Sequence, residues 1–236
     1  MPREMPLLAV LIDADNTSHK HAKAVFDEIA RFGEASVRRI YGDFSSGQMK
    51  GWSSVQAELG IVPHHQPANT VGKNASDIAL VIDAMDLMHS GRFDGFVLVS
   101  SDSDFTRLAS RIREQGLDVF GIGEKKTPEA FRNACKRFLF VENLSGLPAG
   151  DSRKGSKPDT QLLNDARNLI VRAMDAIDQE SDWFNLGTIG QSIIAAKPDF
   201  DTRTYGKAKL SELVGEIKTL ETKRGDGNSI LVRRLD

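Results

Sequence analysis

The chain has 236 residues, of which 40% are hydrophobic, and its 31 basic and 33 acidic side chains leave a net charge of -2. This length allows one sizeable domain and a small second one, and the charge is too evenly balanced to identify a polyanionic partner by itself. The single cysteine, Cys135, excludes an internal disulfide framework and a cysteine-based zinc site.

Apolar runs of strand length alternate with longer segments of helical period from the N-terminus to about Val141. We expect strands near 7–12, 36–41, 61–65, 95–100, 117–122 and 137–141. We expect helices near 18–32, 47–59, 75–89, 104–115 and 128–136. This alternation is typical of repeated βα units, so it predicts an α/β domain with a mostly parallel sheet.

Aspartates follow the first and fourth predicted strands. Asp13 comes directly after the apolar run 7–12, with Asn16 in the turn beyond it, and Asp102 and Asp104 come directly after the run 96–99. Asp77 lies in the first turn of the predicted helix 75–89. Because parallel strands present the residues at their carboxyl ends at one edge of the sheet, we expect these carboxylates to lie close together.

Carboxylates gathered in this way repel one another unless a hard cation lies among them, and Mg²⁺ or Mn²⁺ prefers an all-oxygen site. The pattern therefore predicts a divalent-metal site and phosphate chemistry. Each residue also has a structural explanation, since Asp13 or Asp104 could cap a following helix and first-turn aspartates such as Asp77 are common. His64 and His65 could be ligands or a general base, but turn residues are the favoured interpretation.

The predicted helix 75–89 places one apolar set on a single face: Ile78, Val81, Ile82, Met85 and Met88. Ser76 is its expected cap. Asp83 and Asp86 lie off that face and are expected to be solvated.

Residues 145–158 are rich in Gly, Ser and Pro and lack a period, which predicts a flexible linker. Beyond it, a helical pattern, short periodic segments and a strand-like end predict a small winged-helix unit. We therefore expect a first domain over 1–145, a linker over 146–158 and a second domain over 159–236. No segment matches a signal peptide or a membrane span, so a cytoplasmic protein is expected.

The chain resembles the NYN domain of the PIN-like nuclease superfamily, which includes the LabA-like proteins. The resemblance is carried by DADN at 13–16, YGD at 41–43, GKNASDIALVIDAMD at 72–86, GRFDGFVLVSSDSDF at 91–105 and KTPEAF at 126–131. It implies a Rossmann-like fold and a ribonuclease dependent on Mg²⁺ or Mn²⁺. The implied metal ligands and their supporting residue are Asp13, Asp77, Asp102, Asp104 and Asn16.

The tail resembles the OST-HTH or LOTUS domain, a winged-helix module, through WFNLGTIGQSI at 183–193 and PDFDTRTYGKAKLSEL at 198–213. This resemblance implies binding of RNA or of a protein partner. Trp183 and the other large apolar residues of the tail are expected in its core. The residues expected to contact RNA are Lys73, Ser101, Lys125, Lys126, Arg203, Lys207 and Lys209, although a solvated charged surface explains most of them equally well.

Two other functions stay open. The first motif also matches the DxDxT opening of haloacid-dehalogenase-type phosphatases, in which Asp13 would be the nucleophile, but the later motifs come in the wrong order. An RNA-binding adaptor with an inactive nuclease fold is the second alternative. The oligomeric state, the RNA that is cut, and endonucleolytic versus exonucleolytic cleavage are also left open.

Overall fold

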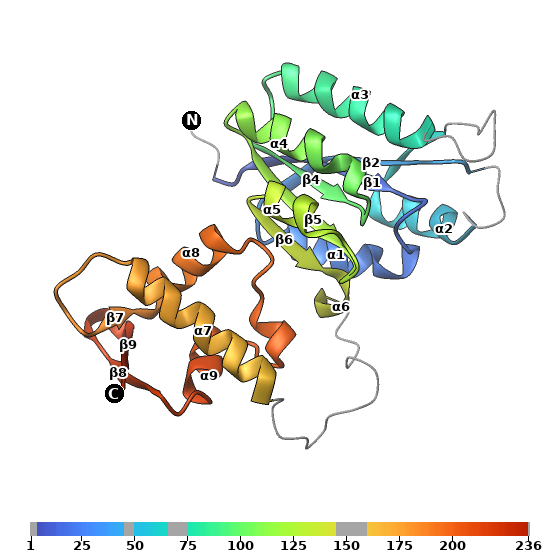
Figure 1. Cartoon of the computed structure of the whole chain (residues 1–236). Coiled ribbons are helices and arrows are strands. Elements are labelled where there is room, and N and C mark those ends of the chain that lie inside the picture. The colour runs from blue at the N-terminus through green and yellow to red at the C-terminus, as the bar shows by residue number, and fades with distance from the viewer. Residues whose placement is uncertain (1–3, 45–49, 66–74, 145–159, 236) are drawn as a thin grey trace. The chain divides into compact units, whose positions relative to one another are not determined.

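The computed structural model describes residues 4–44, 50–65, 75–144 and 160–235 (Figure 1). The chain divides into two compact units, Met1–Leu147 and Pro148–Asp236, and each has its own core. The expected linker, 146–158, lies outside the described residues.

The first unit is built on a six-stranded sheet with the order β3-β2-β1-β4-β5-β6, in which every neighbouring pair is parallel. Its strands are β1 (Leu7–Asp13), β2 (Glu34–Gly42), β3 (Val62–His65), β4 (Gly95–Val99), β5 (Asp118–Gly123) and β6 (Arg137–Phe140). The chain runs from β1 to one edge of the sheet and then returns to build the other half from β4. The point where strand order reverses therefore lies between β1 and β4, where ligands bind in open α/β sheets.

Helices cover both faces of this sheet. They are α1 (Ala22–Ile29), α2 (Lys50–Leu59), α3 (Ala75–His89), α4 (Thr106–Glu114), α5 (Glu129–Ala134) and α6 (Val141–Leu144), with short 3-10 turns η1 (His19–His21) and η3 (Ser103–Phe105). Figure 1 shows α3 and α4 on one face and α1 on the other. Strand β1 is apolar from Leu7 to Ile12 because Leu11 packs on the α3 side and Val10 and Ile12 pack on the α1 side. The parallel α/β fold predicted from the sequence is confirmed.

Helix α3 has the predicted bounds, and its buried face agrees with the predicted one in part, because Met88 is buried and Val81 and Met85 pack against the core. Ile78 and Ile82 are 60% and 58% exposed, whereas Leu80 and Ala84 are buried against the sheet. The helix carries apolar residues on most of its sides, so periodicity alone could not select the packed face.

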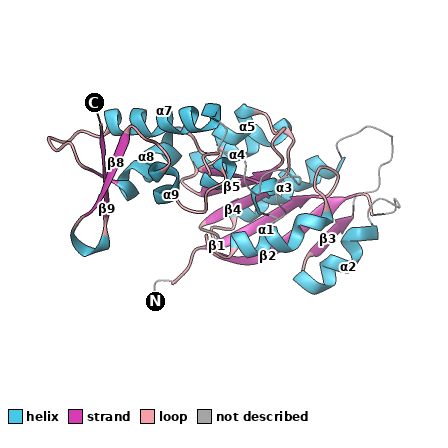
Figure 2. Ribbon diagram, turned by 90° about the horizontal axis from the view of Figure 1, so that it is seen from below, coloured by secondary structure: helices cyan, strands magenta, loops and turns pink. Residues whose placement is uncertain are grey.

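The second unit consists of helices and a small sheet (Figure 2). Its elements are α7 (Thr160–Ala176), β7 (Phe184–Asn185), α8 (Leu186–Ala196), η4 (Thr202–Tyr205), α9 (Leu210–Gly215), β8 (Leu220–Arg224), η5 (Asp226–Asn228) and β9 (Ile230–Arg234). The strands form an antiparallel sheet with the order β7-β9-β8. Buried side chains from α7, α8, α9 and β9, such as Ile170, Ile189, Leu213 and Val232, form its core. This agrees with the winged-helix unit expected from the sequence.

Within the described parts of the chain, no helix combines the length and the apolar character that crossing a membrane requires.

Candidate active site

Asp13 lies at the centre of the carboxyl edge of the sheet. It ends β1, pairs with Tyr41 of β2 and is only 1% exposed. On its other side β4 ends at Val99, and the next residue, Ser100, is also buried. The side chain of Asp13 is therefore held at the point where strand order reverses.

The Asp13 carboxylate organises the turn that follows β1. Its Oδ1 accepts hydrogen bonds from the backbone N–H groups of Asp15 (3.1 Å) and Asn16 (3.2 Å). Its Oδ2 accepts from Nδ2 of Asn16 and from Oγ of Ser100, both at 2.7 Å. Burial raises the pKa of Asp13, and the hydrogen bonds from Ser100 and Asn16 oppose that rise. Asp13 is not a helix cap, because Ser18 caps the next helical turn.

The turn after β4 brings a second carboxylate to this edge. The backbone N–H of Asp102 donates to Oγ of Ser100 at 3.0 Å, and Oδ1 of Asp102 accepts from the backbone N–H of Asp104 at 2.9 Å. Asp102 is thus the residue that caps the following 3-10 turn, a role that the sequence had suggested for Asp104. Ser100 contacts both Asp13 and the Asp102 turn, and sequence reasoning gave it no role at the site. A serine directly after a buried strand and before an acidic pair was the available signal.

Helix α3 contributes Asp77. Burial raises the pKa of Asp77 to about 6, and the negative charges of Asp13, Asp102, Asp15 and Asp104 act in the same direction. These five side chains therefore share one electrostatic environment.

Ser76 connects this helix to the turn after β1. Its hydroxyl donates to Oδ2 of Asp15 at 2.9 Å, so it links the two segments that carry Asp77 and Asp13. The expectation that Ser76 caps α3 is wrong, because the helix already includes Ala75.

The donor set suits a hard cation in its chemistry, since it is made of carboxylate oxygens and the charges of the other carboxylates raise the pKa of Asp77. Across residues 4–44, 50–65, 75–144 and 160–235, however, no group of three or more His, Cys, Asp or Glu side chains is gathered closely enough to hold a metal ion. The carboxylates share a neighbourhood without forming a closed ligand cage.

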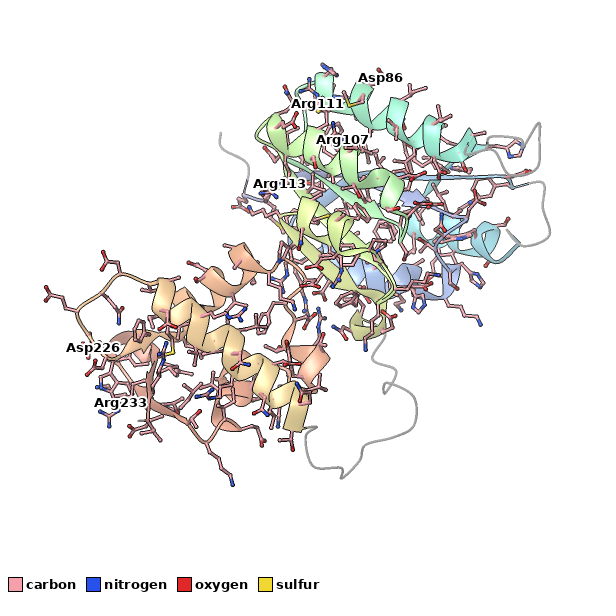
Figure 3. All side chains as sticks on the ribbon, viewed as in Figure 1. Asp86, Arg107, Arg111, Arg113, Asp226 and Arg233 are labelled. Atoms are coloured by element: carbon pink, nitrogen blue, oxygen red, sulfur yellow. The ribbon has the colours of Figure 1, made fainter. Side chains whose placement is uncertain are left out.

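A polar cluster anchors α3 on the sheet. Asp83 accepts hydrogen bonds from the guanidinium of Arg39 and from the hydroxyl of Tyr41, and its side chain is only 19% exposed. Burial, followed by the effect of Asp83, raises the pKa of Tyr41. The expectation that Asp83 is solvated is therefore wrong, whereas Asp86 is exposed on the outer side of the helix (Figure 3).

The two histidines end β3 beside this cluster. The ring of His64 lies 5.1 Å from that of Tyr41, and Nδ1 of His65 accepts from the backbone N–H of Phe44 at 3.2 Å. His65 therefore has a structural role in the turn after β2.

The residues expected to contact RNA in the first unit have different surroundings. Ser101 is buried, and its hydroxyl oxygen accepts from the backbone N–H of Glu124 at 2.9 Å, which gives it a contact inside the fold. Lys125 and Lys126 are surface residues after β5, and Nζ of Lys126 pairs with Glu124 at 2.9 Å. Lys73 lies outside the described residues.

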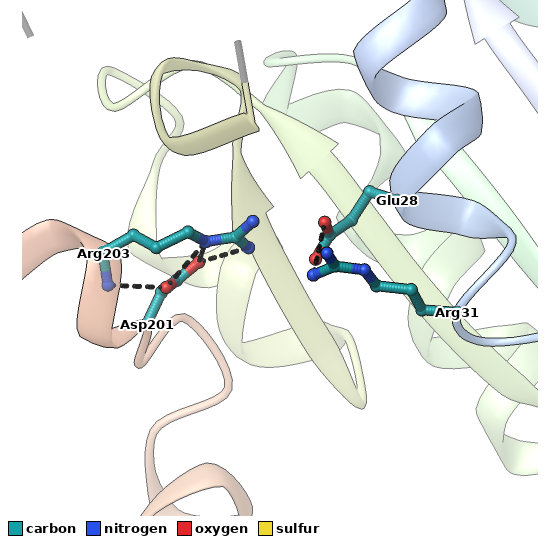
Figure 4. Close-up of polar contacts among 4 residues, drawn as sticks. All are labelled: Glu28, Arg31, Asp201 and Arg203. Carbon is teal, nitrogen blue, oxygen red and sulfur yellow. Dashed lines mark hydrogen bonds and ion pairs between the residues drawn. The ribbon is translucent and has the colours of Figure 1, made fainter. Parts of the chain in front are cut away.

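In the second unit, the three basic residues that the sequence offered as candidates for RNA contact have different surroundings. Arg203 is half-buried, and its guanidinium contacts both carboxylate oxygens of Asp201 (Figure 4). Nζ of Lys207 pairs with Glu216 at 2.5 Å, and its side chain is 22% exposed. Lys209 is exposed.

Comparison with known proteins gives two family matches. The NYN domain matches residues 7–142, and the OST-HTH/LOTUS domain matches residues 159–232. No curated protein matches the chain.

Two solved structures are similar to parts of the chain. One is a Vibrio parahaemolyticus protein of unknown function, with 19% identity and a TM-score of 0.48, covering 58% of this chain and 94% of its own. The other is an uncharacterized Nitrosomonas europaea protein, with 27% identity and a TM-score of 0.28, covering 39% of this chain and 87% of its own.

Proposed function

Since the chain belongs to the NYN domain family and carries an OST-HTH/LOTUS domain after it, we propose that it is a ribonuclease that uses Mg²⁺ or Mn²⁺ to hydrolyse RNA phosphodiester bonds. NYN domains are PIN-like nuclease domains and OST-HTH/LOTUS domains bind RNA, so the chain combines a nuclease domain with an RNA-binding module. We assign catalysis to residues 1–145 and selection of RNA to residues 159–236.

The observation that carries this proposal is that carboxylates from β1, from the turn after β4 and from α3 share one neighbourhood at the point where strand order reverses, although within the described residues they do not form a closed ligand set. Asp13 and the Asp102 turn are joined through Ser100, and Asp77 shares their electrostatic environment. We propose that Asp13, Asp77 and Asp102 hold the cation, with Asp104 beside them. A divalent ion bound there would activate a water molecule and stabilise the departing oxygen of the phosphodiester.

The protein's own groups prepare the site for this reaction. Asn16 and Ser100 orient the Asp13 carboxylate through their hydrogen bonds, and the buried position of Asp13 excludes bulk water from it. Because its pKa is about 6, Asp77 holds a proton on part of the molecules near neutral pH and releases it when positive charge arrives. We propose that Lys125 and Lys126, exposed residues that follow the carboxyl end of β5, contact the RNA backbone.

The test is incubation of the purified full-length protein with a labelled single-stranded RNA in Mg²⁺, in Mn²⁺ and in EDTA. We expect cleavage with at least one ion, none in EDTA, and none by Asp13→Asn with either ion. If the RNA stays intact at millimolar concentrations of both ions, the ribonuclease proposal is wrong and the function as an RNA-binding adaptor replaces it. Turnover of a small phosphomonoester together with an aspartyl phosphate on Asp13 would instead identify a phosphatase.

A further inference from the structure

Trp183 lies outside the core in which the sequence placed it. The core of the second unit includes the next residue, Phe184, as a partly buried member, but Trp183 is absent from it and is half-buried at the surface. Two cations lie over its indole ring: Nζ of Lys223 is 4.0 Å from the ring centroid and Cζ of Arg233 is 4.8 Å from it. A large aromatic side chain is thus held by charged groups rather than by apolar ones.

The pairing of the strands explains this arrangement. Val232 of β9 is fully buried and pairs with Phe184 of β7, so the side chains on either side of Val232 point to the opposite, outer face of the sheet. Arg233 is therefore on the outer face, and so is Trp183, the residue before Phe184. Lys223 of β8 pairs with Leu231 and completes the same face.

This outer face is basic. Lys223 is exposed, whereas its neighbour Arg224, which pairs with Ile230, points to the opposite face of the sheet. Arg233 pairs with Glu221 at 2.6 Å but keeps a side chain that is 42% exposed, and it lies on the outside of the unit in Figure 3. On this face the two cations Lys223 and Arg233 stand against one carboxylate, Glu221.

We propose that Trp183, Lys223 and Arg233 form a binding site for single-stranded RNA, in which one base stacks on the indole and the flanking phosphates contact the two cations. This inference rests on the proposed function and assigns RNA contact in the second unit to this face. An aromatic ring beside cations is how proteins bind unpaired nucleic acid, because a stacked base needs an open ring face and its phosphates need positive charge. Cation–π contacts hold the ring in place before RNA arrives.

The charge pattern favours RNA over a protein partner. The buried centre of a protein interface is depleted of charged residues, and covering Trp183 with a protein would remove Lys223 and Arg233 from water at the same time. Phosphate groups instead compensate both charges. Arg203 and Lys207, other basic candidates of this unit, are paired with Asp201 and Glu216 and are only 26% and 22% exposed, whereas Arg233, although paired with Glu221, is 42% exposed.

The experiment measures RNA affinity separately from cleavage. Full-length protein in EDTA is titrated into a labelled single-stranded RNA and followed by fluorescence anisotropy at several salt concentrations. We expect Trp183→Ala to weaken binding about tenfold, and Trp183→Phe, which keeps a stacking surface, to retain most of the affinity. Lys223→Glu should also weaken binding and should lower the slope of log affinity against log salt by about 0.7, the value for one phosphate contact on a single strand.

Arg172→Ala is the matched control, because it removes an exposed cation of helix α7 in the same unit, outside the proposed face of the sheet. Its affinity should stay within about twofold of that of the unchanged protein. The melting temperature of each variant, followed by circular dichroism, reports whether it is folded.

Unchanged affinity in folded Trp183→Ala and Lys223→Glu would overturn the inference, even if the unchanged protein cleaves RNA with Mn²⁺. Tighter binding to a duplex than to the single strand would also overturn it. Absence of both binding and cleavage in the unchanged protein would remove the proposed function together with the inference.

Discussion

The hydroxyl of Ser100 donates a 2.7 Å hydrogen bond to Oδ2 of Asp13, although the two residues are 87 positions apart in the chain. The same hydroxyl oxygen accepts from the backbone N–H of Asp102 at 3.0 Å. Ser100 therefore couples the carboxylate that ends β1 to the turn that follows β4.

Replacing Ser100 with Ala should raise the pKa of Asp13, because it removes a hydrogen bond that opposes the effect of burial. The acidic limb of the pH profile of Mn²⁺-dependent RNA cleavage should then move to higher pH. The loss of a hydrogen bond to a buried carboxylate should also cost about 1–3 kcal/mol of stability. Ser103→Ala, in an exposed neighbouring serine, is the control. Identical pH profiles for the two variants would contradict this role of Ser100.

Asp77→Asn should stabilise the protein at pH 7 in the absence of metal. Because folding raises the pKa of Asp77 from 3.8 to about 6, its contribution to stability is present below about pH 4 and is lost as pH rises through about 6. The substituted amide carries no charge and avoids this loss, so we expect a gain of about 1 kcal/mol after allowance for solvent screening, or about 2–4 °C in Tm. Asp86→Asn, on the exposed side of the same helix, should leave the melting curve between pH 4 and pH 7 unchanged. A lower Tm for Asp77→Asn at pH 7 would show that burial and the neighbouring negative charges do not destabilise the ionised Asp77 carboxylate.

Millimolar Mn²⁺ or Mg²⁺ should raise the Tm of the unchanged protein, because an ion that binds only the folded state stabilises it, by about 2.7 kcal/mol at a concentration 100 times Kd. Asp13→Asn and Asp102→Asn should each remove this shift and should reduce RNA cleavage to a similar extent. Asp15→Ala should keep substantial activity, since Asp15 serves as the acceptor for Ser76. Thermal melting with and without EDTA and initial cleavage rates provide the measurements. Full activity of Asp102→Asn would exclude it as a ligand.

Asp83→Asn should destabilise the first unit. The substituted amide keeps one acceptor, so it cannot serve both Arg39 and Tyr41 as the carboxylate does, and about 1–3 kcal/mol of the free energy of unfolding should be lost. Urea denaturation measures this change. Asp86→Asn makes the same chemical change on the exposed side of α3 and should stay within about 0.5 kcal/mol of the unchanged protein. Equal effects of the two substitutions would refute the anchoring role of Asp83.

A chain ending at Ala149 should remain folded, because the first unit has its own buried core. It should cleave short single-stranded RNA at a rate close to that of the full chain and should bind longer RNA more weakly, since the second unit raises the local concentration of bound RNA. Cleavage rates and affinities for short and long RNAs check this. Complete loss of catalysis with an intact fold would show that the second unit contributes to the active site itself.

The sheet and its acidic edge were predictable from the sequence because both depend on local patterns. A strand buried on both faces must be apolar throughout, and the first polar residue after such a strand, as Asp13 is after the apolar part of β1, marks its carboxyl end. Because the strands are parallel, the residues at their carboxyl ends lie at the same edge of the sheet. Their proximity therefore follows from the strand pattern alone.

Other features depend on pairings between distant segments, and the sequence could not supply them. Helix α3 is apolar on most sides, so the sequence does not show which side packs against β1 and β2. Only that packing shows that Ile82 is exposed and that Asp83 accepts a hydrogen bond from Arg39. The outward orientation of Trp183 follows from the pairing of Phe184 with Val232, about half the length of the unit away in sequence. Lys207 is paired because α9 ends next to Glu216, which no short-range pattern indicates.

The central position of β1 has a consequence for synthesis of the chain on the ribosome. β1 is the first strand to emerge, and it pairs with β2 soon afterwards, but its other edge stays open until β4 appears, since Leu8 pairs with Gly95. During that interval the nascent protein exposes an apolar strand with unpaired backbone groups, which is the feature that promotes intermolecular association. We therefore expect the yield of native protein to depend on chaperones that shield the nascent chain until β4 has emerged, and to fall when the chain is refolded at high concentration.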